Sequence, residues 1–341
     1  MTVAPASFDL ASRMKLTVAC DPFDSVRALM DGTLQAPELE LDFVTDMTNP
    51  ERHMRMVRDL AFDVCELNIS TFLIAHDQSV PVTAIPVFLF RKFRHGNIFV
   101  RADSGIAHPN DLKGRRVGLP NLQPAANVWI KGILRDEFGL GYHDFIHVVQ
   151  EDEEIAFDPP SGLRVERALA GAKVFDMLER GDLPAVISPL VPDAIAEPQS
   201  GVRRLFPDYL ARERAYFVRT GLFPIMHVTV VRNDLLRRHP WLGARLCGLF
   251  EAAKHMAYRH VANTRLVPLA WFGAHWEDEC NLFGGDAWPN GLTALNRRNV
   301  QTAIDYSFDQ GLMRRKPAIE DLFVDVADFG EPALGSTTSI K

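Results

Sequence analysis

Short runs of β-branched and aliphatic residues alternate with amphipathic helical stretches along most of the chain. Such alternation is typical of an α/β fold, in which strands and helices follow one another. We expect a first half-sheet made of strands at residues 15–20, 39–44, 62–69, 82–90 and 97–101. Later strands are expected at residues 115–120, at 146–150, at the end of 174–188 and at 227–232.

The helical stretches carry apolar residues at three- and four-residue spacing. Asn49 and Pro50 predict a helix start, after which Met54, Val57 and Ala61 share one face. A further helix, over residues 70–76, should begin where the strand before it ends. The longest amphipathic stretch follows a proline at position 240, and its apolar face comprises Leu242, Leu246, Leu249, Ala253, Met256 and Ala257.

Two segments rich in turn-forming residues, near positions 102 and 222, interrupt this pattern and predict crossings between two lobes. The first lobe would comprise 14–101 plus 227–330, and the second lobe 102–226. Two α/β lobes joined by two inter-lobe crossings resemble a type II periplasmic-binding-protein fold. Clefts between lobes are preferred ligand sites, so we expect the site beside the crossings.

Charge and cysteine content narrow the class of protein. The 37 Lys and Arg against 44 Asp and Glu give a net charge of −7, and no basic block offers a footprint for nucleic acid. The four cysteines form no CxxC pair, which argues against a disulfide framework and a zinc cage. No run of about 18 apolar residues predicts a membrane span.

The ends of the chain carry no pattern of a packed element. The first residues lack the continuous apolar run of a signal peptide. Residues 1–13 and 331–341 are therefore expected to be loose termini. Together with the cysteine pattern, these features predict a cytoplasmic protein that binds neither nucleic acid nor membrane.

Several phrases of the sequence point to one family. The more specific ones are FRH (93–95), before the first crossing, and TGLFPIMH (220–227), at the second. Others are FDVCELNISTFL (62–73), NVWIKGILRDEFG (127–139) and GGDAWPNGLTALNRR (284–298). On these phrases the chain resembles the 4,5-dihydroxyphthalate decarboxylase family, which consists of cytoplasmic enzymes on a binding-protein fold. The resemblance covers about residues 15–325.

The second lobe departs from the family pattern. Asn121 and Ala125 replace other residues of the loop after that lobe's first strand, and the segment 150–154 is QEDEE rather than a Gly-Gly-Glu-Glu loop. Ser25 stands where the family has an arginine, whereas Arg27 is retained. We expect residues 150–170 to form an acidic surface loop.

The resemblance implies non-oxidative decarboxylation of a hydroxylated aromatic acid, as in dihydroxyphthalate to dihydroxybenzoate plus CO2, without a cofactor or metal. This chemistry needs a proton donor of near-neutral pKa, which suits histidine. His95 precedes the first crossing and His227 follows the second, so both can converge on the cleft. The alternative is that each histidine only bonds backbone carbonyls at the hinge.

A carboxylate in the apolar strand 62–69, Glu66, must find a partner there or have a raised pKa. It could bond the substrate phenol or tie down a neighbouring loop. The substrate carboxylate would suit an arginine, and Arg91 and Arg94 are candidates. If the strand stays extended, 91, 93 and 95 point one way and 92 and 94 the other, so one arginine at most accompanies His95.

Other candidate substrate-binding residues rest on position or on the resemblance. Asn68, Ser70 and Thr71 lie at a strand exit and helix start, where they could bind an anion or simply cap the helix. The resemblance adds four further positions, which are Arg27, Gln123, Asp286 and Trp288.

Alternatives to an enzyme remain open at this point. The decarboxylase is the leading hypothesis, and the departures in the second lobe motivate the alternative of a non-catalytic cytosolic solute-binding protein for a small aromatic or other organic anion. A self-sacrificing synthase of the pyrimidine type, which shares the fold, would need a histidine that bonds pyridoxal phosphate, and none is identified. The partner expected in either main case is a small aromatic carboxylate, and the chain could form a homo-oligomer.

Overall fold

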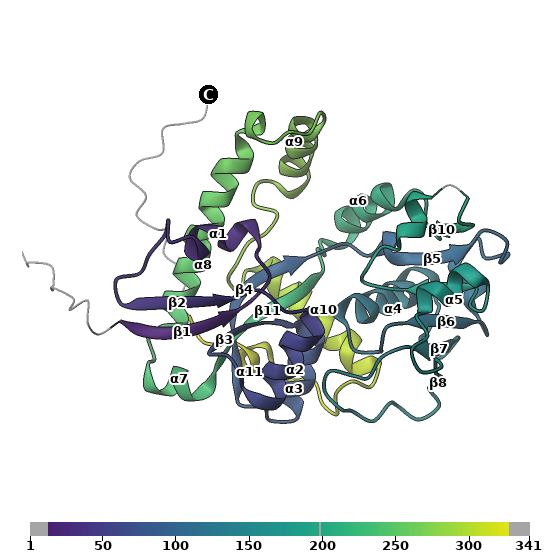
Figure 1. Ribbon diagram of the computed structural model, residues 1–341, viewed down its shortest axis with the longest axis horizontal. Coiled ribbons are helices and arrows are strands. Elements are labelled where there is room, and N and C mark those ends of the chain that lie inside the picture. Colours follow the sequence, from purple (N-terminus) through teal and green to yellow (C-terminus); the bar gives the residue numbers. More distant parts are fainter. Residues whose placement is uncertain (1–12, 198, 327–341) are drawn as a thin grey trace, which may run out of the picture.

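The computed structural model describes residues 13–197 and 199–326. The predicted loose ends, 1–13 and 331–341, lie outside this part of the chain except for Arg13. Figure 1 shows two α/β bodies side by side, each built on its own sheet. The predicted two-lobed α/β fold is confirmed.

The first lobe contains a five-stranded sheet in the order β2-β1-β3-β11-β4. Its strands are β1 (Met14–Ala19), β2 (Leu39–Val44), β3 (Val64–Asn68), β4 (Val82–Arg91) and β11 (Ile225–Arg232). β1 runs parallel to β2 and β3, whereas β11 is antiparallel to both β3 and β4. The late strand β11 therefore lies between β3 and β4 in a sheet made mostly from the first hundred residues.

The second lobe contains a six-stranded sheet in the order β10-β5-β9-β6-β7-β8. Its strands are β5 (Ile98–Arg101), β6 (Arg116–Leu119), β7 (Ile146–Val149), β8 (Val165–Arg167), β9 (Ala185–Ile187) and β10 (Val202–Arg204). β6 is parallel to β7 and β9, whereas β5 is antiparallel to β9 and β10.

The place of β5 corrects one prediction. We expected residues 97–101 to complete the first half-sheet, yet β5 pairs with β9 and β10 of the second sheet. The chain crosses between the lobes before β5, through residues 92–97. The second crossing, after residue 220, lies beside the first, because the Lys92 backbone N–H donates to the Pro224 carbonyl oxygen at 3.1 Å.

The described part of the chain contains eleven α-helices. They are α1 (Arg27–Met30), α2 (Asn49–Asp59), α3 (Ile69–Asp77), α4 (Ala125–Phe138), α5 (Val174–Arg180), α6 (Tyr209–Thr220), α7 (Asn233–Arg238), α8 (Leu242–Ala262), α9 (Phe272–Phe283), α10 (Ala294–Asp309) and α11 (Ile319–Leu322). The apolar face predicted after position 240 is confirmed in α8, where Leu242, Leu246, Leu249 and Ala253 are buried.

Helix α2 differs from its prediction. It begins after Thr48, and the buried side chains are Arg52, His53, Met56 and Val57. Met54 is only partly buried and Ala61 is exposed. The helix therefore turns a cation and an imidazole inward, because both find acidic partners in the protein interior.

The three helices α3, α4 and α10 pack together and join the lobes (Figure 1). α10, from the C-terminal part of the chain, contacts both α3 of the first lobe and α4 of the second. Trp129 of α4 lies edge to face against Tyr306 of α10, with ring centroids 5.3 Å apart. Trp129 is fully buried, so its role is in the core.

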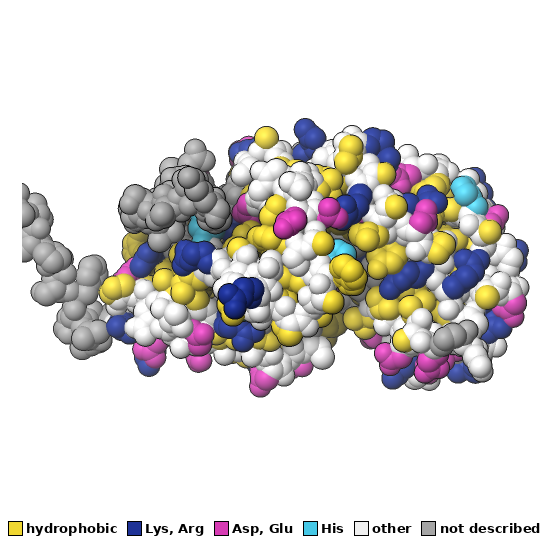
Figure 2. All heavy atoms as spheres, turned by 90° about the horizontal axis from the view of Figure 1, so that it is seen from above, with side chains coloured by type: hydrophobic (Ala, Val, Ile, Leu, Met, Phe, Trp, Pro, Cys, Tyr) yellow, Lys and Arg dark blue, Asp and Glu magenta, His cyan; other side chains and the backbone are white. Residues whose placement is uncertain are grey.

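The surface agrees with the charge pattern of the sequence. On the face shown in Figure 2, Lys and Arg side chains lie among acidic and apolar ones rather than in one broad patch. Within residues 13–197 and 199–326, no helix combines the length and apolar content needed to cross a bilayer.

Candidate active site

A buried carboxylate and imidazole meet on neighbouring strands of the first sheet. Glu66 of β3 lies opposite Thr229 of β11, and His227 is two positions away on that strand. This diagonal spacing brings long side chains on one face together. The Glu66 Oε1 atom accepts a hydrogen bond from His227 Nδ1. The Glu66 side chain is fully buried, whereas that of His227 keeps 7% of its surface exposed.

The second oxygen of Glu66 is held by two other groups. Arg52 Nη2 donates to Oε2 at 2.9 Å, and the Asp21 backbone N–H donates to it at 2.8 Å. The same guanidinium also binds the Asp21 side chain through Nη1 at 2.8 Å. Both oxygens of Glu66 are thus occupied by donors, and this fixes the imidazole of His227 in one orientation.

The charges of this group follow from these contacts. Burial would raise the pKa of Glu66, but His227 and Arg52 oppose burial and hold that pKa at about 2. Burial lowers the pKa of His227, and Glu66 counteracts part of that effect. Glu66 is therefore an anion at neutral pH, placed to stabilise an imidazolium when His227 takes up a proton.

A second carboxylate–histidine pair lies beside the first. His53 Nδ1 of α2 is 3.1 Å from Glu154 Oε1, and Thr71 of α3 donates its hydroxyl to the other oxygen of Glu154. Burial would raise the pKa of Glu154, but His53 and Thr71 lower it. The rings of His53 and His227 are nearly perpendicular, with centroids 5.5 Å apart.

Arg94 lies close to the same group of side chains. Its guanidinium is 5.7 Å from the ring centroid of Phe90, and that ring is 5.1 Å from the His227 ring. Arg94 is buried and donates to the Met226 sulfur and the Pro189 carbonyl oxygen. Burial lowers its pKa to about 10. Both of these hydrogen-bond partners are uncharged, so they leave the guanidinium charge available to an anion.

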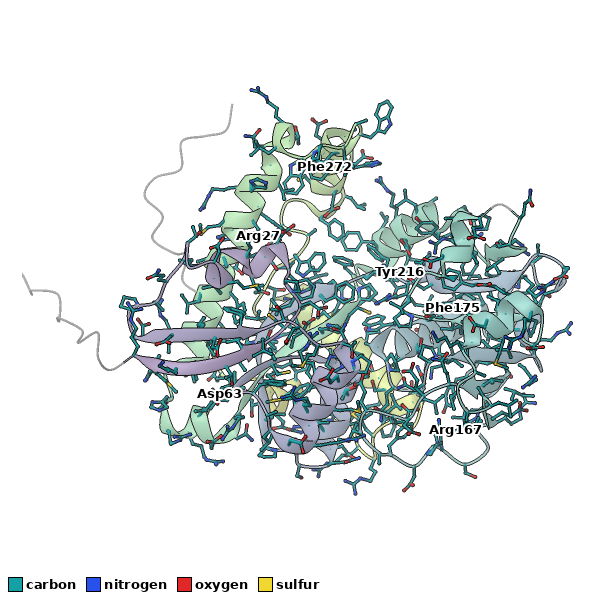
Figure 3. All side chains as sticks on the ribbon, viewed as in Figure 1. Arg27, Asp63, Arg167, Phe175, Tyr216 and Phe272 are labelled. Carbon is teal, nitrogen blue, oxygen red and sulfur yellow. The ribbon has the colours of Figure 1, made fainter. Side chains whose placement is uncertain are left out.

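His95 does not join His227, contrary to expectation. Its Nε2 atom is 3.2 Å from Glu137 at the end of α4, and its ring packs against Tyr216 of α6, which Figure 3 labels on the second lobe. The backbone leaves the extended conformation after β4 and forms the 3-10 turn η3 (His95–Asn97). This turn rotates His95 into the second lobe, where burial lowers its pKa to about 4.

Arg91 also lies away from His227. Its guanidinium binds the Pro289 carbonyl oxygen and the Asn296 side chain at the start of α10, and it lies over the ring of Phe88. The strict alternation assumed for residues 91–95 fails at the turn, so Arg94 and not Arg91 lies over Phe90, the ring that contacts His227.

Asp286 and Trp288, which the resemblance implies as substrate-binding residues, hold the C-terminal segment in place through hydrogen bonds. Asp286 binds Lys254 of α8 at 2.6 Å and accepts the Trp288 backbone N–H. The indole N–H of Trp288 donates to the Phe88 carbonyl oxygen of β4 at 2.7 Å. These contacts attach the segment to the first sheet and give neither residue a place beside His227.

Arg27 is a surface residue. Its side chain is 68% exposed and pairs with Asp24 one turn earlier. Figure 3 labels it on α1. Its expected role in substrate binding is not supported by any contact with the residues around His227 in the described chain.

Asn68, Ser70 and Gln123 connect the lobes at the starts of two helices. The Asn68 side chain caps α3 through Ser70 and also accepts the Ala125 backbone N–H of α4 at 2.9 Å. The Ser70 hydroxyl donates to the Gln123 carbonyl oxygen. The capping role of Asn68 is confirmed, and the same oxygen links one lobe to the other.

The acidic segment after β7 is not simply a surface loop. Glu153 accepts the backbone N–H groups of Leu122 and Gln123 at 2.8 and 3.1 Å, and the Glu154 residue is only 4% exposed. Asn121 holds the segment through the Asp152 carbonyl oxygen. The segment thus buries the Glu154 carboxylate against His53 and Thr71 of the first lobe, whereas Glu153 is half-buried within the second lobe.

Sequence reasoning missed Arg52, His53 and Glu154. Arg52 and His53 occupy positions on α2 that share a face with Met56 and Val57. Charged or imidazole side chains at core positions of a helix are a usable signal, because such groups need buried partners. Glu154 gave no local signal, since its partners lie 83 and 101 residues earlier in the chain.

Comparison with solved structures shows the fold. The periplasmic aliphatic sulphonate binding protein SsuA from Escherichia coli is 16% identical, with a TM-score of 0.53 over 95% of this chain and 96% of its own. The desulfurization enzyme DSZB is 19% identical, with a TM-score of 0.50 over 91% of this chain and 96% of its own. One fold thus carries a binding protein and an enzyme.

Comparison with sequence families is more specific. Residues 28–158 match the family model described as NMT1/THI5 like. The 4,5-dihydroxyphthalate decarboxylase of Comamonas testosteroni is 32% identical over 92% of this chain and 97% of its own length. The enzyme of that name from Pseudomonas putida is 32% identical over 58% of this chain and 80% of its own. The chain is a member of the 4,5-dihydroxyphthalate decarboxylase family.

Proposed function

We propose that the protein removes one carboxyl group, as CO2, from 4,5-dihydroxyphthalate or a closely related hydroxylated aromatic acid. The observation that carries this proposal is the buried Glu66–His227 pair, which lies beside Phe90 with Arg94 over the same ring. Family membership supports the reaction class, and these side chains supply the groups that the reaction needs.

His227 would deliver the proton to the ring carbon that carries the leaving carboxylate. Its Nδ1 is engaged by Glu66, so Nε2 is the nitrogen that handles the proton. A lowered pKa makes the imidazolium a stronger acid, and the Glu66 anion keeps that imidazolium accessible. The new C–H bond forms first; the C–C bond then breaks, and its electron pair restores the aromatic ring.

Arg94 would hold a carboxylate of the substrate. A buried guanidinium whose hydrogen-bond partners are uncharged favours an anion, and its planar donors match a carboxylate in two contacts. The neighbouring Phe90 offers an apolar surface to an aromatic ring. The substrate would thus lie between Arg94 and His227.

The described conformation encloses this site. Glu66 is fully buried and His227 nearly so, and contacts such as Ser70 to Gln123 join the lobes. We infer that the lobes separate to admit substrate and close again before reaction. Closure would remove water from the carboxylate and favour release of neutral CO2.

We place the protein in the cytoplasm. Its four cysteines are all free, and Cys20, Cys65 and Cys247 are buried. Burial raises the pKa of each of these three thiols, which keeps them protonated and inert. Free thiols are the usual state in a reducing compartment.

The test is a turnover assay with purified protein. We would supply 4,5-dihydroxyphthalate, 4-hydroxyphthalate and a panel of hydroxybenzoates, and follow CO2 release, product formation and thermal stabilisation in parallel. Catalytic CO2 release from a member of this panel is the expected result. Thermal stabilisation without turnover across the panel would contradict it and favour the solute-binding alternative.

A further inference from the structure

We propose that His53 is a second catalytic residue, which accepts the proton of the substrate phenol while His227 protonates the ring carbon. This inference rests on the proposed function. It follows from the geometry of two carboxylate–histidine pairs, Glu66–His227 and Glu154–His53, whose rings are 5.5 Å apart.

The contact with Glu154 fixes the proton on one nitrogen of His53. An ionised carboxylate accepts but does not donate, so Nδ1 carries the hydrogen in this pair. Nε2 then has a free lone pair. That atom is buried and has no hydrogen-bond partner in the described part of the chain. A buried acceptor without a donor is costly, and a substrate hydroxyl would satisfy it.

A positive charge on His53 or on Arg52 would oppose protonation of His227, because the two imidazole rings are 5.5 Å apart. Each ring lies against an anion, but His53 and His227 repel one another when both are protonated, and Arg52 adds a further positive charge. A proton on His227 and an unprotonated Nε2 on His53 would give an acid and a base at the same time. This is the pair of groups that decarboxylation of a phenolic acid requires.

The step balances without any co-reactant. His227 begins as the imidazolium and gives its Nε2 proton to the ring carbon as His53 takes the phenolic proton, so the positive charge moves from one ring to the other. CO2 leaves with cleavage of the C–C bond, whose electrons restore the aromatic ring. His53 returns its proton to the phenolate, and His227 recovers one from water. One proton is consumed for each CO2 released.

His53 would have its Glu154 partner, and so be oriented as a base, only when the two lobes are closed. His53 and Thr71 belong to the first lobe, whereas Glu154 follows β7 of the second. Arg58 of α2 also donates to the Glu154 carbonyl oxygen at 3.0 Å and so positions this segment. Lobe closure thus supplies the anion that orients His53, and proton transfer is coupled to substrate enclosure.

The experiment compares His53→Gln with His227→Gln in the full chain. The first measurement is wild-type turnover of 4,5-dihydroxyphthalate, because absence of turnover would overturn both the proposed function and this inference. With an active wild type, we expect kcat of His53→Gln to fall by about 100-fold. The thermal midpoint, and the affinity for phthalate, which has no hydroxyl for His53 to bind, should stay close to wild type.

A ring-fluorinated substrate separates a base from a structural residue. In 3-fluoro-4,5-dihydroxyphthalate the phenol loses its proton more easily, so it depends less on a base. The deficit of His53→Gln relative to wild type should shrink by at least tenfold with this substrate, while that of His227→Gln should not shrink. Glu154→Gln should behave as a milder form of His53→Gln.

Two results would overturn the role of His53 and leave the proposed function intact. One is an active wild type with unchanged kcat in His53→Gln. The other is a deficit of the same size with both substrates, which would mean that His53 only supports the fold of the site.

Discussion

The Nδ1 atom of His53 lies 3.1 Å from the Oε1 atom of Glu154, a residue 101 positions further along the chain and on the other lobe. Both side chains are buried, so neither can lose its partner cheaply. The contact therefore links the closed conformation of the lobes to the orientation of the His53 ring. Opening of the lobes would expose Glu154 to water and leave His53 without its anion.

Replacement of His227 tests the proton donor. His227→Gln should lower kcat by about 100-fold or more, because glutamine can replace the contact with Glu66 but cannot transfer the proton. The measurement is the initial rate of CO2 release at saturating substrate. His95→Gln is the matched control, since His95 is equally buried but lies against Glu137 and Tyr216. Its kcat should stay within about threefold of wild type, and equal losses in the two variants would contradict the assignment.

Replacement of Arg94 tests carboxylate binding. Arg94→Lys keeps the charge but loses the two parallel donors, so KM should rise by about tenfold or more, with a smaller change in kcat. Steady-state kinetics across a substrate range would measure this. Arg91→Lys should instead lower the melting temperature, because Arg91 supports Pro289 and Asn296, and leave KM unchanged. A larger KM effect from Arg91 would reverse the two roles.

The burial of His147 should make the stability of the protein depend on pH. It lies buried in β7 with neither ring nitrogen hydrogen-bonded within the described residues, and burial lowers its pKa to about 3. In the unfolded chain His147 takes up a proton as the pH falls below about 6.5. In the folded protein His147 stays neutral until the pH approaches 3. The stabilisation is therefore complete above about pH 6.5 and is lost as the pH falls towards 3.

The variant His147→Leu should remove this dependence. Between pH 7 and 5, wild type should lose about 2 kcal/mol of unfolding free energy that the variant keeps. Urea unfolding at a series of pH values would show the difference. The control is His275→Leu on α9, where the side chain is exposed and the pH profile should match wild type. Parallel profiles for His147→Leu and wild type would show that folding does not lower the pKa of His147.

Two glycines in helices should respond in opposite ways to alanine. A Cβ at Gly132 of α4 would overlap the ring of Tyr306, whose hydroxyl binds Asp136 at 2.6 Å. Gly132→Ala should therefore lower the unfolding free energy by about 1–3 kcal/mol. A Cβ at Gly248 of α8 meets open space, so Gly248→Ala should raise stability by about 0.5–1 kcal/mol. Thermal and urea unfolding would test this, and stabilisation by both changes would show that α10 yields at Tyr306.

Much of the fold could be predicted from sequence, because it depends on local pattern. The strands around Leu41, Val87 and Val230 and the apolar face of α8 follow from periodicity and burial. Glu66 could be singled out because a carboxylate inside an apolar strand needs a partner. The resemblance to the family rests on short sequence motifs found in both lobes.

Several site residues could not be assigned in this way. The predicted convergence of His95 with His227 failed at the turn η3, where one change in backbone conformation redirects a side chain to the other lobe. Arg91 and Arg94 differ for the same reason, since alternation holds only while a strand stays extended. Trp288 and Asp286 have local roles that only their partners on β4 and α8 reveal.

The sequence by itself determined the order of strands and helices, the family and the types of side chain that could move a proton. Tertiary structure alone decided which of them meet. Glu66 and His227 pair because β11 inserts beside β3, and His53 and Glu154 pair because two lobes close on one another. Periodicity reports which face of an element is buried, but the partner across an interface depends on how distant elements pack.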